Sequence, residues 1–177
     1  MSQKSSLIFC SASYDIDPRF NDVARDVVRA LHAAGYSIVS GGTVKGTMGV
    51  VADEAHSLGA ENIGVIPKFM ECYVHPDLDK VIWTELMSER KDLMREYGKD
   101  LAIALPGGVG TMDELFETFT LAKLGKYDGR LIVVNCYGFY DKLEEFVDYL
   151  TQTRMLDEHT RTLISFPKSL EEFRKLL

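Results

Sequence analysis

The chain has 177 residues, of which 46% are hydrophobic and 27% are charged, and its formal net charge is −7. This length is enough for one domain with a sizeable buried core and too short for two ordinary domains. The acidic balance argues against a nucleic-acid backbone or an anionic membrane surface as the main partner. We therefore expect a single globular domain over residues 1–177 that binds neither nucleic acid nor membrane.

Neither a membrane span nor a secretory leader is expected. Its start, MSQKSSLIFCSAS, lacks a long apolar core and a cleavage site, and no later apolar run reaches spanning length. Cys10, Cys72 and Cys136 are odd in number and far apart, which suits reduced thiols better than a disulfide framework. A cytoplasmic location is expected.

Short apolar runs alternate with helical patterns along the whole chain. Strands are expected, in chain order, at 7–10, 36–42, 62–67, 80–86, 100–108, 130–136 and 161–166. Helices are expected between and after them, at 17–35, 47–59, 88–98, 111–125, 139–153 and 169–177. Strands that are apolar along their whole length and separated by helices indicate an α/β fold with a parallel sheet covered on both faces.

Ligands of such sheets bind beyond the carboxyl ends of the strands. The distinctive short motifs of this chain, SGG, PK, MSERK, PGGVGT and NCYG, all follow expected strands and therefore share that edge. The irregular segment 68–79 is long for a loop inside a compact domain, and loops of this kind often border a ligand site. The sequence thus predicts a single binding crevice at this edge.

The motif PGGVGT contains Gly107, Gly108, Gly110 and Thr111 at a strand-to-helix junction. Glycines let the backbone approach a ligand closely, and the following helix offers unpaired N–H groups and the positive end of its dipole. Thr111 adds a hydroxyl group. A tight turn without a ligand is the simpler alternative, but three glycines in four residues favour an anion site.

The motif SGGTVKGTMG is a second glycine cluster and contains Gly41, Gly42 and Gly46. It nearly fits a P-loop, but Thr47 stands where the phosphate-binding lysine belongs. The chain also lacks G-x-G-x-x-G, which disfavours a dinucleotide dehydrogenase. Two glycine-rich loops at one crevice therefore suggest a smaller phosphorylated ligand, such as a mononucleotide.

Glu114 and Arg90 are the candidate reactive side chains. Thr111 and Glu114 also fit a T-x-x-E capping box, so a role in capping the helix and a role in the site are about equally supported. Arg90 and Lys91 fall in the first turns of a helix, where basic residues oppose the dipole unless they pair with an acid or a ligand. A solvated charged face is the alternative for this pair.

These motifs together resemble the LOG ("lonely guy") family, the cytokinin riboside 5′-monophosphate phosphoribohydrolases, many of whose relatives carry the older label "lysine decarboxylase". PGGVGTMDE resembles the family's P-G-G-x-G-T-x-x-E, and MSERK resembles its M-x-x-R-K. SGGTVKGTMG resembles its G-G-G-x-x-G-x-M-G, and IFCSAS resembles its opening strand. The resemblance covers essentially the whole chain, with every motif in order.

The resemblance implies a Rossmann-like, doubly wound, mainly parallel sheet, usually in a homodimer. It implies a hydrolase that cleaves the N-glycosidic bond of adenosine 5′-monophosphate, N6-substituted or not, to the free base and ribose 5-phosphate. The motif match puts Arg90 and Glu114 in the catalytic positions, with Lys91 in support. It assigns substrate binding to the glycines and the threonine: Gly41, Gly42, Gly46, Gly107, Gly108, Gly110 and Thr111. The implied chemistry needs no metal and no cofactor.

The chain departs from the family pattern at Thr43, which replaces a glycine, and at Ser88, which replaces a common histidine. The spacing from Arg90 to Glu114 is also one residue longer. These departures bear on the preferred base more than on the reaction.

A nucleotide-binding or carrier protein without catalysis is the alternative function. A true lysine decarboxylase would need a pyridoxal cofactor on a lysine, and no motif supports one.

Two further features, a possible zinc site and a possible dimer contact, also have simpler explanations. Cys72 and His75 have a C-x-x-H spacing, but no second ligand pair supports a zinc site. The helix at 111–125 is apolar over a broad surface that suits a dimer contact, the core, or both.

Overall fold

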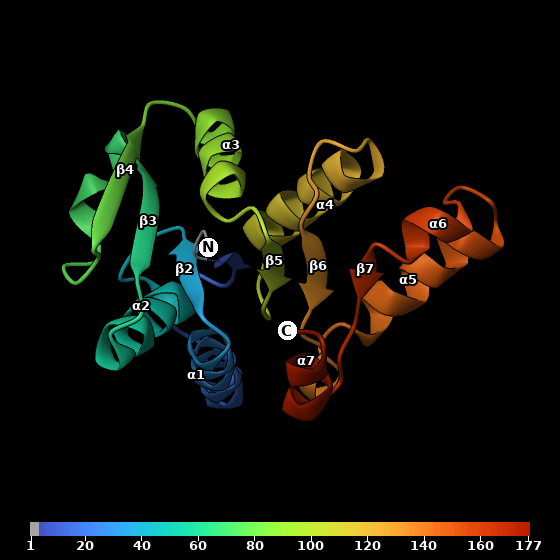
Figure 1. Cartoon of the computed structure of the whole chain (residues 1–177), viewed down its shortest axis with the longest axis horizontal. Coiled ribbons are helices and arrows are strands. Elements are labelled where there is room, and N and C mark those ends of the chain that lie inside the picture. The colour runs from blue at the N-terminus through green and yellow to red at the C-terminus, as the bar shows by residue number, and fades with distance from the viewer. Residues whose placement is uncertain (1–3) are drawn as a thin grey trace.

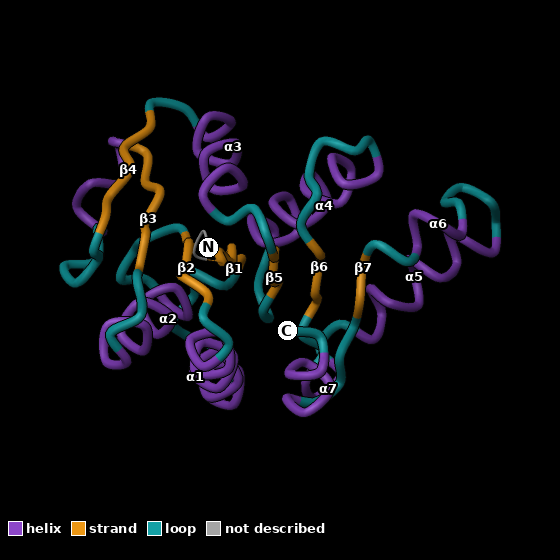
Figure 2. Tube along the Cα trace, in the orientation of Figure 1, coloured by secondary structure: helices purple, strands orange, loops and turns teal. Residues whose placement is uncertain are grey.

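A computed structural model describes residues 4–177, and their strands form one seven-stranded sheet (Figures 1 and 2). The strands are β1 (Lys4–Phe9), β2 (Tyr36–Ser40), β3 (Asn62–Pro67), β4 (Lys80–Thr84), β5 (Leu101–Ala104), β6 (Arg130–Val133) and β7 (Ile164–Ser165). Their order is β4-β3-β2-β1-β5-β6-β7, and every neighbouring pair is parallel. The expected doubly wound α/β fold is confirmed.

The helices cover both faces of this sheet. They are α1 (Pro18–Ala33), α2 (Gly46–Leu58), α3 (Met87–Tyr97), α4 (Val109–Lys123), α5 (Asp141–Gln152), α6 (Glu158–Arg161) and α7 (Leu170–Lys175), with the 3₁₀ segments η1 (Lys68–Tyr73) and η2 (Cys136–Gly138). In Figure 1, α1, α2 and α7 lie on one side of the strands and α3 and α4 on the other. None of the helices within residues 4–177 has the length and apolar character needed to cross a membrane.

Each face of the sheet buries its own apolar cluster. One cluster joins the sheet to α1, α2 and α7, with Leu31 and Phe173 fully buried. The other joins it to α3, α4 and α5, and includes Met94, Leu115 and Phe119. The broad apolar surface of α4 is therefore largely core, although Leu124 at its end is exposed.

The position of the site follows from the strand order, which reverses its direction at β1 in the centre of the sheet. From β1 the chain runs through α1 to β2 on one side, whereas β5 pairs with the other side of β1. The loops that leave β1 and β5 consequently diverge toward opposite faces and open a crevice between them.

Several element boundaries differ from the expected ones. The strand expected at 161–166 shrinks to Ile164–Ser165, because the chain before it forms the short helix α6. Asp157 caps that helix, and its carboxylate accepts a hydrogen bond from the Thr160 N–H at 2.8 Å. A helix of four residues is too short to produce a periodic pattern in the sequence.

The segment 68–79 has a fixed shape instead of being an irregular loop. Its first half is η1, and the chain around the end of η1 pairs with the loop after β2. Val44 N–H donates to Tyr73 O, and His75 N–H donates to Gly42 O, both at 2.9 Å. His75 is buried; its Nδ1 accepts from Asp77 N–H, so its Nε2 donates to Asp53 at 3.0 Å. Cys72 is exposed. These contacts hold one wall of the crevice in place.

Candidate active site

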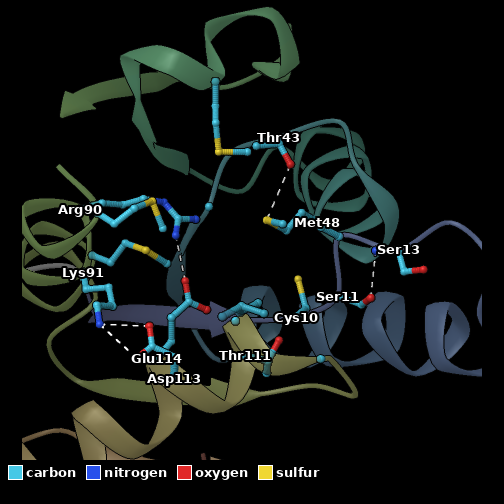
Figure 3. Close-up of a pocket in the computed structure, with 18 residues that line it drawn as sticks. Cys10, Ser11, Ser13, Thr43, Met48, Arg90, Lys91, Thr111, Asp113 and Glu114 are labelled. Atoms are coloured by element: carbon cyan, nitrogen blue, oxygen red, sulfur yellow. Dashed lines mark hydrogen bonds and ion pairs between the residues drawn. The ribbon is translucent and has the colours of Figure 1, made fainter. Parts of the chain in front are cut away.

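A cavity of about 350 Å³ lies at the carboxyl edge of the sheet, where the loops after β1 and β5 diverge (Figure 3). Its walls come from the β1–α1 loop, the end of β2, the start of α2, η1, and the first turns of α3 and α4. The lining includes these candidate residues: Gly41, Arg90, Lys91, Gly108, Gly110, Thr111 and Glu114. Motifs that are far apart in the sequence thus meet in one cavity.

Arg90 is buried, with only 9% of its side chain exposed, and is not part of a solvated charged face. Its Nε donates to the carbonyl oxygen of Val65 in β3, and its Nη1 donates to Oε1 of Glu114, both at 2.9 Å. A Cβ atom at Gly41 would lie 2.3 Å from its Nη2. Glycine at position 41 is therefore what allows the guanidinium to lie against the end of β2.

Glu114 extends from the second turn of α4 into the cavity, and 12% of its side chain is exposed. Burial raises the pKa of this carboxyl group, because removal from water disfavours its charged form. The positive charge and hydrogen bond of Arg90 act in the opposite direction and lower the pKa. The site therefore holds a desolvated carboxylate next to a fixed cation.

The start of α4 has the properties of an anion site. The helix begins at Val109, and Gly108 at its N-cap provides no side-chain hydrogen bond to the first turn. A Cβ atom at Gly108 or Gly110 would meet nothing within 4 Å, so the backbone there faces open space. The Thr111 hydroxyl is buried and has no hydrogen-bond partner within residues 4–177. The capping-box alternative is wrong, because Glu114 pairs with Arg90 and Thr111 caps nothing.

The remaining candidate glycines support the cavity from outside. Gly42 packs against Gly64 and Ile66 of β3, and Gly46 packs against the backbone of the β1–α1 loop; both have positive φ angles. Gly107 lies against Thr111, where a Cβ atom would clash with the hydroxyl at 2.1 Å. None of the three is among the residues that line the cavity.

Lys91 belongs to a row of charges that joins α3 to α4. Its Nζ lies 3.0 Å from Asp113 and 2.9 Å from Glu117, and the bond to Glu117 is the main reason why its pKa is raised. Glu117 also accepts from Nη1 of the buried Arg95 at 3.1 Å. Lys91 is thus held by acids on α4, and the row fixes the two helices that carry Arg90 and Glu114.

Sequence reasoning missed an apolar part of the lining. Four methionines face the cavity: Met48, Met70, Met87 and Met94. Met48 and Met87 belong to the motifs SGGTVKGTMG and MSERK, and that position was the signal from which their place in the cavity could have been predicted. Cys10 and Ser11, which follow β1, also line the cavity. Burial, reinforced by the negative charge of Glu114, raises the pKa of the Cys10 thiol, which keeps it protonated and a poor nucleophile.

The two departures from the family pattern lie in different surroundings. Thr43 is buried at 1% exposure and lines the cavity. Ser88 is exposed near the start of α3 and is not among the lining residues. Thr43 is therefore the departure that reaches the site.

The row of charges predicts a specific loss of stability. In Glu117→Gln, the negative charge of the oxygen that Lys91 and the buried Arg95 share is lost, so two charge-assisted hydrogen bonds become weaker ones to a neutral amide. We expect the free energy of unfolding to fall by about 1–3 kcal/mol, measured by urea denaturation.

The matched control is Glu171→Gln, since Glu171 pairs with Lys175 on an exposed helix surface where its side chain is 79% exposed. That change should cost less than about 0.5 kcal/mol. Equal losses in the two variants would show that the row does not join α3 to α4.

The chain is similar to known proteins of one family. A family model described as "Possible lysine decarboxylase" matches residues 48–177. The cytokinin riboside 5′-monophosphate phosphoribohydrolase of Mycobacterium tuberculosis is 37% identical over 149 residues, which are 82% of this chain and 78% of that protein. The probable cytokinin riboside 5′-monophosphate phosphoribohydrolase LOG6 of Arabidopsis thaliana is 34% identical over 176 residues, 98% of this chain and 87% of that protein.

Solved structures with the same fold are more distant in sequence. A molybdenum cofactor binding protein from Rippkaea orientalis has a TM-score of 0.70 at 20% identity, and the molybdenum cofactor carrier protein of Chlamydomonas reinhardtii has 0.73 at 17%. Each match covers 99% of this chain and 96% of the other. At these identities the likeness concerns the fold alone. The family model and the relatives at 34–37% identity establish that the chain belongs to the LOG family, the cytokinin riboside 5′-monophosphate phosphoribohydrolases.

Proposed function

We propose that this chain hydrolyses the N-glycosidic bond of adenosine 5′-monophosphate or an N6-substituted derivative, releasing the base and ribose 5-phosphate. The observation that carries the proposal is the buried pair of Glu114 and Arg90, one helical turn from an open helix N-terminus. The names of its relatives in the LOG family support the same reaction.

The 5′-phosphate binds at the start of α4. Unpaired N–H groups and the helix dipole favour an anion there, and the bare backbone of Gly108 and Gly110 leaves room for one. The Thr111 hydroxyl, buried without a partner, donates to a phosphate oxygen. Anchoring the phosphate fixes the ribose next to Glu114, since Thr111 and Glu114 are one turn apart on the same helix.

Glu114 acts at C1′ of the ribose. As the bond from C1′ to the base nitrogen breaks, positive charge develops on the sugar ring, and a nearby carboxylate stabilises that charge. Water then bonds to C1′, and its proton passes to the carboxylate, from which it returns to solvent or to the departing base. In the partly desolvated cavity this interaction is stronger than it would be in water.

Arg90 holds Glu114 in place and faces the departing base. Its Nε and Nη1 are occupied by Val65 O and Glu114, whereas Nη2 makes no hydrogen bond to residues 4–177. That group is available to stabilise the negative charge that the base acquires as the bond breaks.

The direct test is incubation of the purified protein with AMP and with N6-isopentenyl-AMP, followed by chromatography of free base and ribose 5-phosphate. We expect release from at least one of the two nucleotides. In Glu114→Gln, turnover should fall roughly 10²–10⁴-fold, while nucleotide affinity, set mainly by the start of α4, is largely kept. The amide can still accept from Arg90, so the fold is preserved.

Near-normal turnover in Glu114→Gln would remove Glu114 from the mechanism. Saturable nucleotide binding by the unaltered protein, without release of base, would instead identify a nucleotide-binding or carrier protein.

The raised pKa of Glu114 predicts the acid side of the pH–rate profile. Activity requires the ionised carboxylate, so the rate rises as pH increases through the pKa of Glu114. Because burial raises this pKa, we expect the midpoint to lie above the value of about 4.3 for a solvated glutamate. The profile of kcat/KM against pH measures it. A midpoint at the solvated value, or an unchanged midpoint in Glu114→Gln, would contradict the assignment.

We also propose that the protein is a cytoplasmic homodimer. Family resemblance supports the dimer, and light scattering that gives a monomer mass would reject it. The location is supported by Cys10, Cys72 and Cys136, which are all free thiols, as expected in a reducing compartment. Cell fractionation tests the location.

A further inference from the structure

The cavity side chains follow a definite order from the start of α4 to the opposite wall (Figure 3). Thr111 and Glu114 lie one turn apart, and Glu114 bonds to Nη1 of Arg90. The other end of that guanidinium, Nη2, lies against Gly41. A nucleotide with its phosphate at Thr111 and its C1′ at Glu114 therefore directs its base past Arg90, toward Gly41.

Met48 and Thr43 close the cavity at this end. A Cβ atom at Gly41 would lie 2.6 Å from Sδ of Met48 and 2.3 Å from Nη2 of Arg90, so these two side chains flank the same glycine. The Thr43 hydroxyl makes a long hydrogen bond to the Met48 sulfur at 3.7 Å. Met48 is thereby connected to Thr43 at the far wall of the cavity.

The wall behind Thr43 is firmly held. Thr43 forms an isolated β-bridge with Val74, and its hydroxyl oxygen accepts from Lys45 N–H at 3.3 Å. Hydrogen bonds on both sides of the bridge, from Val44 N–H to Tyr73 O and from His75 N–H to Gly42 O, join the two segments further. A larger ligand cannot push Thr43 outward without breaking this pairing.

The LOG pattern has a glycine where this chain has Thr43, so the side chain of Thr43 occupies space that the pattern leaves empty. The cavity measures about 350 Å³, close to the lower end of the range of roughly 300–1,000 Å³ typical of ligand pockets. We propose that Thr43, together with Met48, determines base specificity by restricting the cavity to adenine or adenine with a small N6 substituent. This inference rests on the proposed function, which places the base at this end.

The test compares AMP with N6-benzyl-AMP, whose substituent is large and rigid. Values of kcat/KM are measured for the unaltered protein and for Thr43→Gly, Thr43→Ala and Met48→Ala. We expect the kcat/KM ratio of N6-benzyl-AMP to AMP to rise at least about ten-fold in each variant, since each removes two or three heavy atoms from the wall. Inhibition by ribose 5-phosphate should not change, because the start of α4 is untouched.

Thr43→Val is the matched control, because it keeps the shape of the side chain and removes only the hydroxyl; its ratio should equal that of the unaltered protein. Circular dichroism checks that every variant is folded. An unchanged ratio in Thr43→Gly, Thr43→Ala and Met48→Ala would overturn the inference.

Equilibrium binding of the same two nucleotides separates this inference from the proposed function. If the protein releases no base, the ratio of the two dissociation constants still measures the size of the pocket. In that case, a ratio of dissociation constants that shifts in the three variants would support the role of Thr43, and only the proposed hydrolysis would be rejected. A constant ratio, or no binding of either nucleotide, would refute the role of Thr43.

Discussion

The contact on which the site depends is the burial of one guanidinium against one carboxylate, at 2.9 Å between Arg90 and Glu114. Removing both charges from water is costly, and their attraction offsets that cost only if the geometry is good and further hydrogen bonds are made. Val65 O accepts from Nε, and Gly41 lets the guanidinium lie flat against the end of β2. The row of Lys91, Arg95, Asp113 and Glu117 then keeps α3 and α4 at the separation that the pair needs. A buried ion pair of this kind is weak evidence for stability, so its presence in the cavity is better explained by the proposed chemistry.

Phosphate binding and bond cleavage are assigned to different kinds of chemical group in the same cavity. In the proposed function, the phosphate site is mainly backbone at the start of α4, opened by Gly108 and Gly110, with the Thr111 hydroxyl beside it. The reactive groups that we propose are the side chains of Arg90 and Glu114, which reach the cavity from two helices on one face of the sheet. The loops that leave β1 and β5 diverge and open the crevice in which the backbone site and the side chains meet. The phosphate site depends on a bare backbone, whereas the ion pair depends on the identity of two side chains.

The sequence predicted the parallel sheet, because fully apolar strands separated by helices admit few other arrangements. It also predicted that the motifs share one edge, and the structure brings Gly41, Arg90, Gly108 and Glu114 to one cavity. The role of Glu117 was not predictable, because its two partners belong to another helix whose packing angle the sequence does not reveal. The methionine lining was missed for a related reason. Methionine at helical spacing usually belongs to a core, and here only the fold decides that four of them face a cavity.

The separation of binding from cleavage also explains how one fold can serve proteins with different functions. The solved structures of molybdenum cofactor binding and carrier proteins share this fold at 16–20% identity, and fold alone does not determine function. A helix N-terminus at a crevice binds any anion of suitable size, whether or not a reaction follows. Hydrolysis additionally needs a carboxylate at C1′ that stays ionised despite burial. In this chain the charge of Arg90 opposes the effect of burial on Glu114. The arginine therefore supports the proposed catalysis even without contact to the base, since its charge favours the ionised form of the neighbouring carboxyl group.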